Sequence, residues 1–214
     1  MEEVRLTPNI VHKCLTFKTK SNTMKKTLII HPADTSTDFL KPIYDKIQYK
    51  TVITGGVTPD VIMKEIENHD RIFMMGHGCP SGLFSVDRFP KAYGMVIDSE
   101  TVELLKQKEC VFIWCNADQF VKTHDLKGFY SGMFISEVEE ADYCGFPETT
   151  QKEVTESNNS FAKILGEHSN KSIENMFEET KKKYKVLAES SNVARYNYER
   201  LYCNTEKTIL EEVK

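Results

Sequence analysis

Four short apolar runs limit most strongly how this chain can fold. They lie within residues 25–32, 50–56, 71–78 and 110–118. Runs of this length that stop at glycine, proline or polar residues predict buried β-strands. Segments with helical patterning separate the runs, at residues 37–47, 58–69 and 98–109. Strands that are buried on both faces and alternate with helices predict a mostly parallel, doubly wound sheet in a three-layer α/β/α sandwich.

The second half of the chain continues this pattern. Residues 128–141 are predicted to form a helix, residues 142–146 a possible fifth strand, and residues 172–187 a helix that docks by one face. Residues 1–23 are weakly patterned and are expected to form a loose arm or an added edge strand. The chain has 214 residues and no low-complexity linker, so residues 24–214 are expected to form one domain with C-terminal helices.

Composition argues against several classes of protein. The net charge is −4, and lysine and arginine are not concentrated in one segment, so nucleic acid is not expected as a partner. No apolar run approaches the roughly 20 residues of a membrane span, and the first residues lack the apolar core of a secretory signal. We therefore expect a cytoplasmic protein without a membrane partner, whose six cysteines are reduced.

A histidine and a cysteine follow two of the predicted strands. His77 comes after the apolar run of residues 72–75, and Cys115 comes at the end of the run that begins at residue 111. In a parallel sheet, reactive groups gather outside the carboxyl ends of the strands, and neighbouring strands lie about 4.8 Å apart. If these two strands are neighbours, we expect the imidazole and the thiol to face each other.

An imidazole beside a thiol favours nucleophilic catalysis. The imidazole can activate the thiol, since the thiolate is the reactive form. Gly78 follows His77, and its unobstructed N–H can donate to a developing oxyanion. Taken separately, the histidine is more typical of a hydrogen-bonded strand end and the cysteine of core packing. Their equivalent positions on two strands favour the catalytic interpretation.

The order of these elements resembles that of the caspase-like cysteine peptidases of clan CD. In that family a hydrophobic block ends in His-Gly, a helix follows, and a second hydrophobic block ends in Cys; the blocks here are "RIFMMGHG" and "CVFIWCNAD". The resemblance covers residues 25–145. It implies a caspase-like fold, Cys115 as nucleophile, His77 as acid and base, and an oxyanion hole built from the N–H groups of Gly78 and Cys115. It also implies a protein or peptide substrate and no cofactor.

One sequence motif of the caspases is missing from this chain. The caspase-type motif Q-A-C-x-G is replaced by "IWCNAD", which argues against specificity for aspartate.

Three further residues, Cys79, Asp118 and Glu137, are candidates for substrate binding. Cys79 lies in a loop beside the predicted pair, as a possible second nucleophile or metal ligand. No C-x-x-C pair accompanies it, so no metal site is expected. Asp118 and Glu137 fall, together with Glu139 and Glu140, where such peptidases often form the primary specificity pocket. An acidic side chain facing the cleft would favour a basic substrate residue, whereas solvated helix positions are the alternative.

Two other classes of protein fit parts of the sequence. A caspase-like domain without activity would hold a peptide or protein partner in the same cleft. A flavodoxin-like or receiver-like domain would bind phosphate or a nucleotide, but "GGVTPD" and "GHGCPSG" match neither a P-loop nor G-x-G-x-x-G. The prediction is therefore a cysteine endopeptidase with His77 and Cys115 as its dyad, and the alternative is the inactive binding module.

Overall fold

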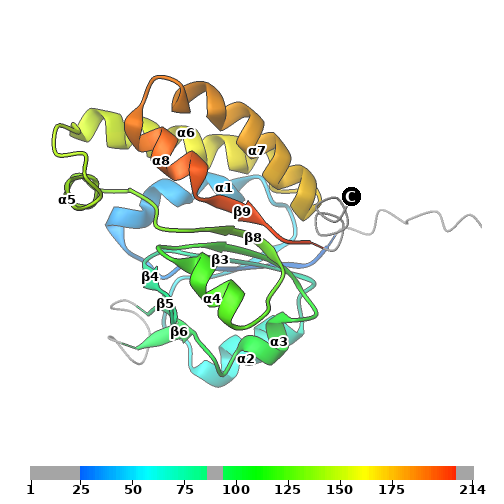
Figure 1. Ribbon diagram of the computed structural model, residues 1–214. Coiled ribbons are helices and arrows are strands. Elements are labelled where there is room, and N and C mark those ends of the chain that lie inside the picture. Colours follow the sequence, from blue (N-terminus) through cyan, green and yellow to red (C-terminus); the bar gives the residue numbers. More distant parts are fainter. Residues whose placement is uncertain (1–24, 86–93, 206–214) are drawn as a thin grey trace, which may run out of the picture.

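A six-stranded sheet forms the centre of the computed structural model, which describes residues 25–85 and 94–205 (Figure 1). The strands, in their spatial order, are β2 (Lys50–Ile53), β1 (Thr27–Ile30), β3 (Arg71–Met75), β7 (Glu109–Ile113), β8 (Gly128–Ser131) and β9 (Leu201–Cys203). Neighbouring strands are parallel, except that β9 runs antiparallel to β8. The order reverses beside β1, so the sheet is doubly wound as predicted.

Helices cover both faces of this sheet (Figure 1). One face carries α2 (Pro59–Glu67), α3 (Val102–Leu105) and α4 (Ala117–Thr123). The other carries the 3-10 helix η1 (Thr35–Leu40), α1 (Pro42–Asp45), α6 (Gln151–His168), α7 (Ile173–Ala188) and α8 (Asn192–Glu199). This arrangement is compatible with the predicted three-layer sandwich.

Smaller elements lie at the carboxyl ends of the central strands (Figure 1). A second, antiparallel sheet consists of β4 (Gly78–Cys79), β5 (Gly82–Phe84) and β6 (Met95–Ile97). The short helix α5 (Val138–Tyr143) lies at the same end. No described helix combines the length and the apolarity that are needed to cross a membrane.

The apolar runs supply two separate cores, one on each face of the sheet. In β3, Ile72 and Met74 pack in the core beneath α2, α3 and α4, whereas Phe73 and Met75 pack in the core beneath α1, α6 and α7. Side chains alternate between the two faces of a strand, so one run of consecutive apolar residues serves both cores. This explains why the runs lack a polar side.

The prediction for residues 128–146 is wrong. The segment predicted as a helix begins with strand β8, and the possible fifth strand at residues 142–146 is instead the end of α5 and the turn after it. The glycine at position 128 is the residue that could have indicated strand β8. A Cβ there would come within 2.2 Å of the carbonyl oxygen of Cys110, so glycine permits the close pairing of β8 with β7.

Other boundaries differ less. The helices predicted at residues 37–47 and 98–109 are shorter in the structure, and η1 and α1 share the first of them. The helix predicted at residues 172–187 is α7, and α8 and the edge strand β9 follow it. The expectation of an arm or edge strand at residues 1–23 lies outside the described residues.

Candidate active site

The two strands that precede His77 and Cys115 are direct neighbours. β3 and β7 pair in parallel, with Met75 opposite Ile113, so that His77 and Cys115 each lie two residues beyond the last pair. The N–H of Gly76 donates to the carbonyl oxygen of Ile113 at 3.1 Å and extends the pairing past the strands. Both side chains line one small cavity of about 20 Å³, roughly the room that one water molecule needs. The two strands are neighbours, as the prediction required, but the thiol and the imidazole bond to other groups and not to each other.

Cys115 lies in a sharp turn between strand β7 and helix α4. The next residue, Asn116, has a φ of 65°, a left-handed conformation that asparagine tolerates better than most residues. The thiol donates to the carbonyl oxygen of Phe134 at 3.4 Å and contacts Oε1 of Glu140 at 3.7 Å. Burial, and next the negative charge of Glu140, raise the pKa of Cys115 to about 12. The thiol is therefore protonated at neutral pH.

Glu140 connects the thiol to the loop before α5. Its Oε2 accepts hydrogen bonds from the N–H groups of Ser136 at 2.7 Å and Glu137 at 3.1 Å, and from the Ser136 hydroxyl at 2.9 Å. These bonds hold the carboxylate at the N-terminus of α5 and leave Oε1 for Cys115. The position of the thiol is thus coupled to residues 136–137.

His77 bonds to a serine of η1 and not to the thiol. Its Nε2 lies 2.6 Å from Oγ of Ser36 in η1, and the same Oγ lies 2.8 Å from Oδ1 of Asp34. A hydrogen bond from the Ser36 N–H, and next that from its hydroxyl, lower the pKa of Asp34 although partial burial opposes them. Asp34 is therefore a carboxylate, which can only accept hydrogen bonds.

The chain Asp34–Ser36–His77 determines which ring nitrogen of the histidine can act as a base. Ser36 has one proton and donates it to the carboxylate, so its oxygen accepts the proton of His77 Nε2. Neutral His77 then keeps its lone pair on Nδ1. The hydrogen-bonded chain therefore fixes both the orientation and the tautomer of the imidazole.

A second histidine, His31, holds η1 in place. It follows β1, and its ring nitrogens bond to the hydroxyls of Tyr44 at 3.0 Å and Thr37 at 3.1 Å. Burial lowers the pKa of His31 to about 4, so it stays neutral. His31 is a structural residue that supports the helix carrying Ser36.

Gly78 begins β4 and packs against the indole of Trp114. A Cβ at this position would come within 2.3 Å of Trp114 Cδ1, so only glycine fits. The Phe84 N–H donates to the carbonyl oxygen of His77 at 2.9 Å. Because backbone groups alternate along an antiparallel ladder, the Gly78 N–H points away from β5, at the free edge of the small sheet. This N–H takes no part in the small sheet, and Gly78 is not among the residues that line the cavity of His77 and Cys115.

The three residues predicted to bind substrate lie in different places. Glu137 lines an open cleft described below. Asp118 lies on α4, and its carboxylate pairs with Lys122 at 2.9 Å; it lines neither this cleft nor the small cavity, so the structure does not bring it into the site. Cys79 lies in β4, where its carbonyl oxygen accepts the Trp114 Nε1–H at 3.1 Å and its sulfur accepts the Ser81 N–H at 3.4 Å. It lines neither cavity.

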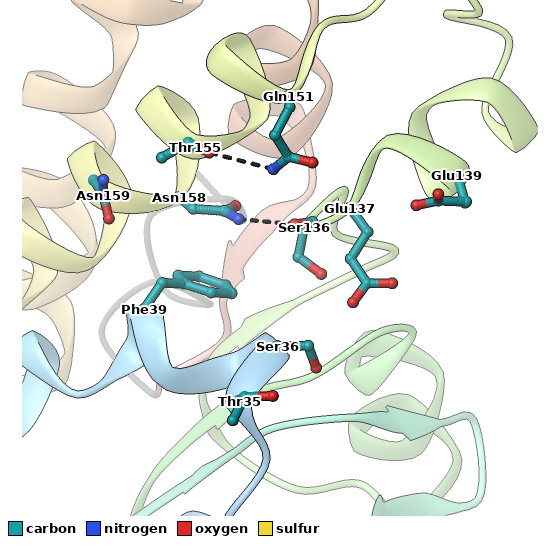
Figure 2. Close-up of a pocket in the computed structure, with 10 residues that line it drawn as sticks. All are labelled: Thr35, Ser36, Phe39, Ser136, Glu137, Glu139, Gln151, Thr155, Asn158 and Asn159. Carbon is teal, nitrogen blue, oxygen red and sulfur yellow. Dashed lines mark hydrogen bonds between the residues drawn. The ribbon is translucent and has the colours of Figure 1, made fainter.

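An open cleft of about 530 Å³ adjoins the small cavity and shares Phe39 and Ser136 with it. Figure 2 shows its three walls: η1 on one side, residues 136–139 on another, and the first turns of α6 on the third. Ser36 lines this cleft and bonds to His77, which itself lines the small cavity. Its volume falls in the range of ligand sites.

Sequence reasoning missed Asp34 and Ser36. A signal was present, because Asp and Ser two residues apart after a strand are typical of a capped turn, and Asp34 does cap η1. That signal predicts the turn but not the contact with His77, which is 41 residues away in the chain.

Comparison with known proteins adds no family to this description. The chain matches no protein-family model and no curated protein sequence. Across residues 25–85 and 94–205, no three His, Cys, Asp or Glu side chains converge as they would around a metal ion. The chemistry of the site therefore has to follow from its own residues.

Proposed function

We propose that the protein is a caspase-like cysteine peptidase that hydrolyses amide bonds in peptides or proteins. Cys115 is the nucleophile, and His77 is the acid and base. The observation that carries the proposal is the equivalent position of the two residues, each two residues beyond a paired strand end and each lining the same cavity. The adjoining cleft offers room for a peptide.

The reaction begins with attack of the Cys115 sulfur on the substrate carbonyl carbon, while the thiol proton moves to Nδ1 of His77. The N–H groups of Gly78 and Cys115 donate to the carbonyl oxygen as it becomes an oxyanion. The imidazolium then protonates the amide nitrogen, and the C–N bond breaks to leave a thioester on the sulfur. A water molecule, deprotonated by His77, attacks the thioester; the C–S bond breaks, and the sulfur regains its proton.

The protonated resting thiol is compatible with this reaction. Catalytic hydrogen bonds are often long in a free enzyme and shorten only when substrate binds. A substrate carbonyl group that enters the cavity displaces the thiol from the oxygen of Phe134, and the thiol then turns to His77. Ser36 and Asp34 act as positioning residues, because they keep Nδ1 free to receive the proton.

The test is the turnover of a peptide-amide library by the wild type and two cysteine variants. We expect Cys115→Ala to lower kcat/KM by about 10³-fold or more while the protein stays folded. The matched control is Cys110→Ala, because Cys110 lies on the same strand, fully buried, with its thiol bonded to the Leu105 carbonyl oxygen. The control is expected to lose stability and keep kcat. Turnover that survives in Cys115→Ala overturns the proposal.

Binding without cleavage is the second candidate function. The observations that favour it are the high pKa of the Cys115 thiol and the bond of His77 to Ser36 in place of the thiol. In that case the library gives no products with any variant, and peptides still bind to the folded wild type. The same experiment therefore separates the two functions.

A further inference from the structure

The loop between β8 and α5 places a backbone carbonyl group against the Cys115 thiol. The thiol donates to the Phe134 carbonyl oxygen at 3.4 Å, and Phe134 and Ser136 line the same cavity as His77 and Cys115. Connecting segments are usually the more mobile parts of a fold. The position of the thiol therefore depends on what holds residues 132–136.

Asn197 on α8 binds the backbone of Ile135, the residue after Phe134. Its Oδ1 accepts the Ile135 N–H at 2.7 Å, and its Nδ2 donates to the Ile135 carbonyl oxygen at 2.9 Å. One carboxamide thus satisfies both backbone groups of a residue, as the partner does in a hydrogen-bonded pair of an antiparallel sheet. The two bonds also fix the orientation of the amide, because the reversed orientation would set donor against donor and acceptor against acceptor.

Burial makes this arrangement specific. Asn197 and Ile135 are both 0% exposed. Nδ2 of Asn197 also lies 3.4 Å from the Ser157 hydroxyl oxygen, so both polar atoms of the carboxamide have partners. An apolar side chain of the same size would fill the space, but it would leave the N–H and the carbonyl group of Ile135 buried without partners. Asn197 is thus needed for the backbone that it binds and not for its volume.

Two further contacts hold the loop on either side of Phe134. Before it, the Gly132 N–H donates at 2.7 Å to the carbonyl oxygen of Arg200, the residue that follows α8. After it, Nδ2 of Asn158 on α6 donates to the Ser136 carbonyl oxygen at 2.8 Å, as Figure 2 shows. These contacts fix the two ends of the segment, and α8 holds its centre.

From these contacts we infer that Asn197 is a positioning residue of the active site. By holding Ile135 it keeps the Phe134 carbonyl oxygen beside the Cys115 thiol, and the loop thereby covers the sulfur and sets its direction in the cavity. Without the carboxamide the loop shifts, and the sulfur becomes more accessible to small reagents and less well aligned for attack on a substrate. The expected effect on turnover rests on the proposed peptidase function, whereas the effect on the accessibility of the thiol does not.

The test is Asn197→Leu, which removes both bonds and keeps the approximate size of the side chain. Cys115 and Cys110 are alkylated by iodoacetamide at pH 8 and quantified separately by mass spectrometry. Cys110 is 0% exposed on β7, so its labelling reports general unfolding. We expect Cys115 to react about tenfold faster than in the wild type while Cys110 stays unlabelled, and kcat for peptides to fall by about tenfold, the equivalent of one hydrogen bond. Asn197→Ser removes the same bonds with less bulk and takes the place of this variant if it does not fold.

Asn204→Leu is the matched control, because Asn204 binds backbone groups in the same manner at the amino end of β8. Its Oδ1 accepts the Gly128 N–H at 2.9 Å, and its Nδ2 donates to the Leu126 carbonyl oxygen at 2.8 Å. The same substitution there removes two hydrogen bonds to the backbone and leaves the thiol covered. We expect it to lower the free energy of unfolding and to leave the labelling of Cys115 and kcat unchanged.

Labelling of Cys115 that is unchanged or slower in the folded Asn197 variant overturns the inference, and so does an equal increase in Asn204→Leu. Either result, together with cleavage of peptides by the wild type, leaves the peptidase proposal standing. Faster labelling in the Asn197 variant alone, together with no cleavage by the wild type, supports the positioning role and contradicts the peptidase proposal.

Discussion

Strands β3 and β7 carry a pair of polar residues at each end, and the two pairs differ in their surroundings. At the amino end Arg71 lies opposite Glu109; its Nε and a terminal nitrogen bond to one carboxylate oxygen at 2.9 and 2.7 Å. Another terminal nitrogen of Arg71 donates to the Ser169 carbonyl oxygen at 3.0 Å, and Lys25 bonds to the second oxygen of Glu109. At the carboxyl end His77 and Cys115 line a cavity that adjoins a cleft.

The difference between the two ends separates a structural pair from the pair that we propose to be catalytic. Burial alone would raise the pKa of Glu109, but the hydrogen bonds from Lys25 and Arg71 outweigh it and lower that pKa. The carboxylate is charged, and its partners satisfy that charge. At the carboxyl end the thiol donates to the carbonyl oxygen of Phe134 at 3.4 Å and contacts Glu140 at 3.7 Å, and it lines a cavity with His77. Groups with incomplete partners beside open space are available to a ligand.

The largest expected effect is on activity at the carboxyl end. His77→Asn removes the proposed base and keeps a polar side chain, so kcat/KM is expected to fall by about 10³-fold, as for the loss of a general acid–base group. The free energy of unfolding, measured with urea, is expected to change by no more than about 1 kcal/mol. A variant that loses both activity and stability would make His77 a structural residue like Arg71.

The second prediction concerns His31, a structural histidine that lies at the same carboxyl end of the sheet. The pKa of His31 is about 4 in the folded protein, below its ordinary value of 6.5. As the pH falls from 6.5 to 4, His31 binds a proton in the unfolded chain but stays neutral in the folded protein. The contribution of His31 is therefore complete above pH 6.5, and about 3 kcal/mol of stability is lost by pH 4. Urea unfolding at several pH values measures this loss, and His31→Gln should remove that part of the pH dependence; an unchanged pH dependence would exclude His31 as its source.

At the amino end we expect an effect on stability alone. Arg71 is 5% exposed, and Arg71→Met leaves Glu109 with Lys25 as its remaining partner and the Ser169 carbonyl oxygen without its donor. The free energy of unfolding is expected to fall by about 2 kcal/mol, with kcat/KM unchanged for the folded protein. A tenfold loss of kcat/KM in folded Arg71→Met would mean that the two ends are coupled.

Ser36→Ala probes the positioning chain with a smaller effect. Without its acceptor on Nε2, His77 can take up the other tautomer, so we expect kcat to fall by about tenfold, the equivalent of one hydrogen bond, with KM little changed. The pH profile of kcat is the readout that separates this role from a structural one, and it should shift. Ser36→Thr keeps the hydroxyl and should restore most of kcat; equal loss in both variants would argue against the chain.

The smallest effect concerns the reactivity of the thiol without substrate. Glu140→Gln removes the charge beside Cys115 and keeps the side-chain oxygen that accepts from Ser136 and Glu137. The pKa of Cys115 should fall, and its alkylation by iodoacetamide at pH 8, followed at this residue by mass spectrometry, should rise by about threefold or more. Glu156→Gln, at an exposed position of α6, is the matched control with no expected effect. A slower reaction in Glu140→Gln would mean that the carboxylate activates the thiol.

The sheet, and the pair at the carboxyl ends of its strands, could be predicted because both depend on local sequence patterns. Apolar runs that end in turns mark strands wherever they occur, and His77 and Cys115 needed only that two such strands be neighbours. Strand β8 could not be found in this way, because its pairing depends on the approach of Gly128 to Cys110 on another strand. A local sequence pattern does not predict contacts between residues that are far apart in the chain.

The same reason explains which contacts within the site were missed. Ser36 reaches His77 from a helix 41 residues earlier, and Glu140 reaches Cys115 from 25 residues later. Both are polar residues near helix starts, where capping is a sufficient explanation in sequence. Asp118 shows the opposite case, because it follows Cys115 closely in the chain and yet α4 directs it to Lys122.

The most direct test of the account is covalent labelling by a mixture of peptidyl acyloxymethyl ketones that differ in the residue next to the reactive group. The account predicts one adduct on Cys115 of the wild type, identified by mass spectrometry. It also predicts labelling slowed by about 100-fold in His77→Asn, since the imidazole activates the sulfur, and unchanged in Arg71→Met. A folded wild type that is never labelled on Cys115, or equal labelling in His77→Asn, would contradict the claim that these two residues form a catalytic pair.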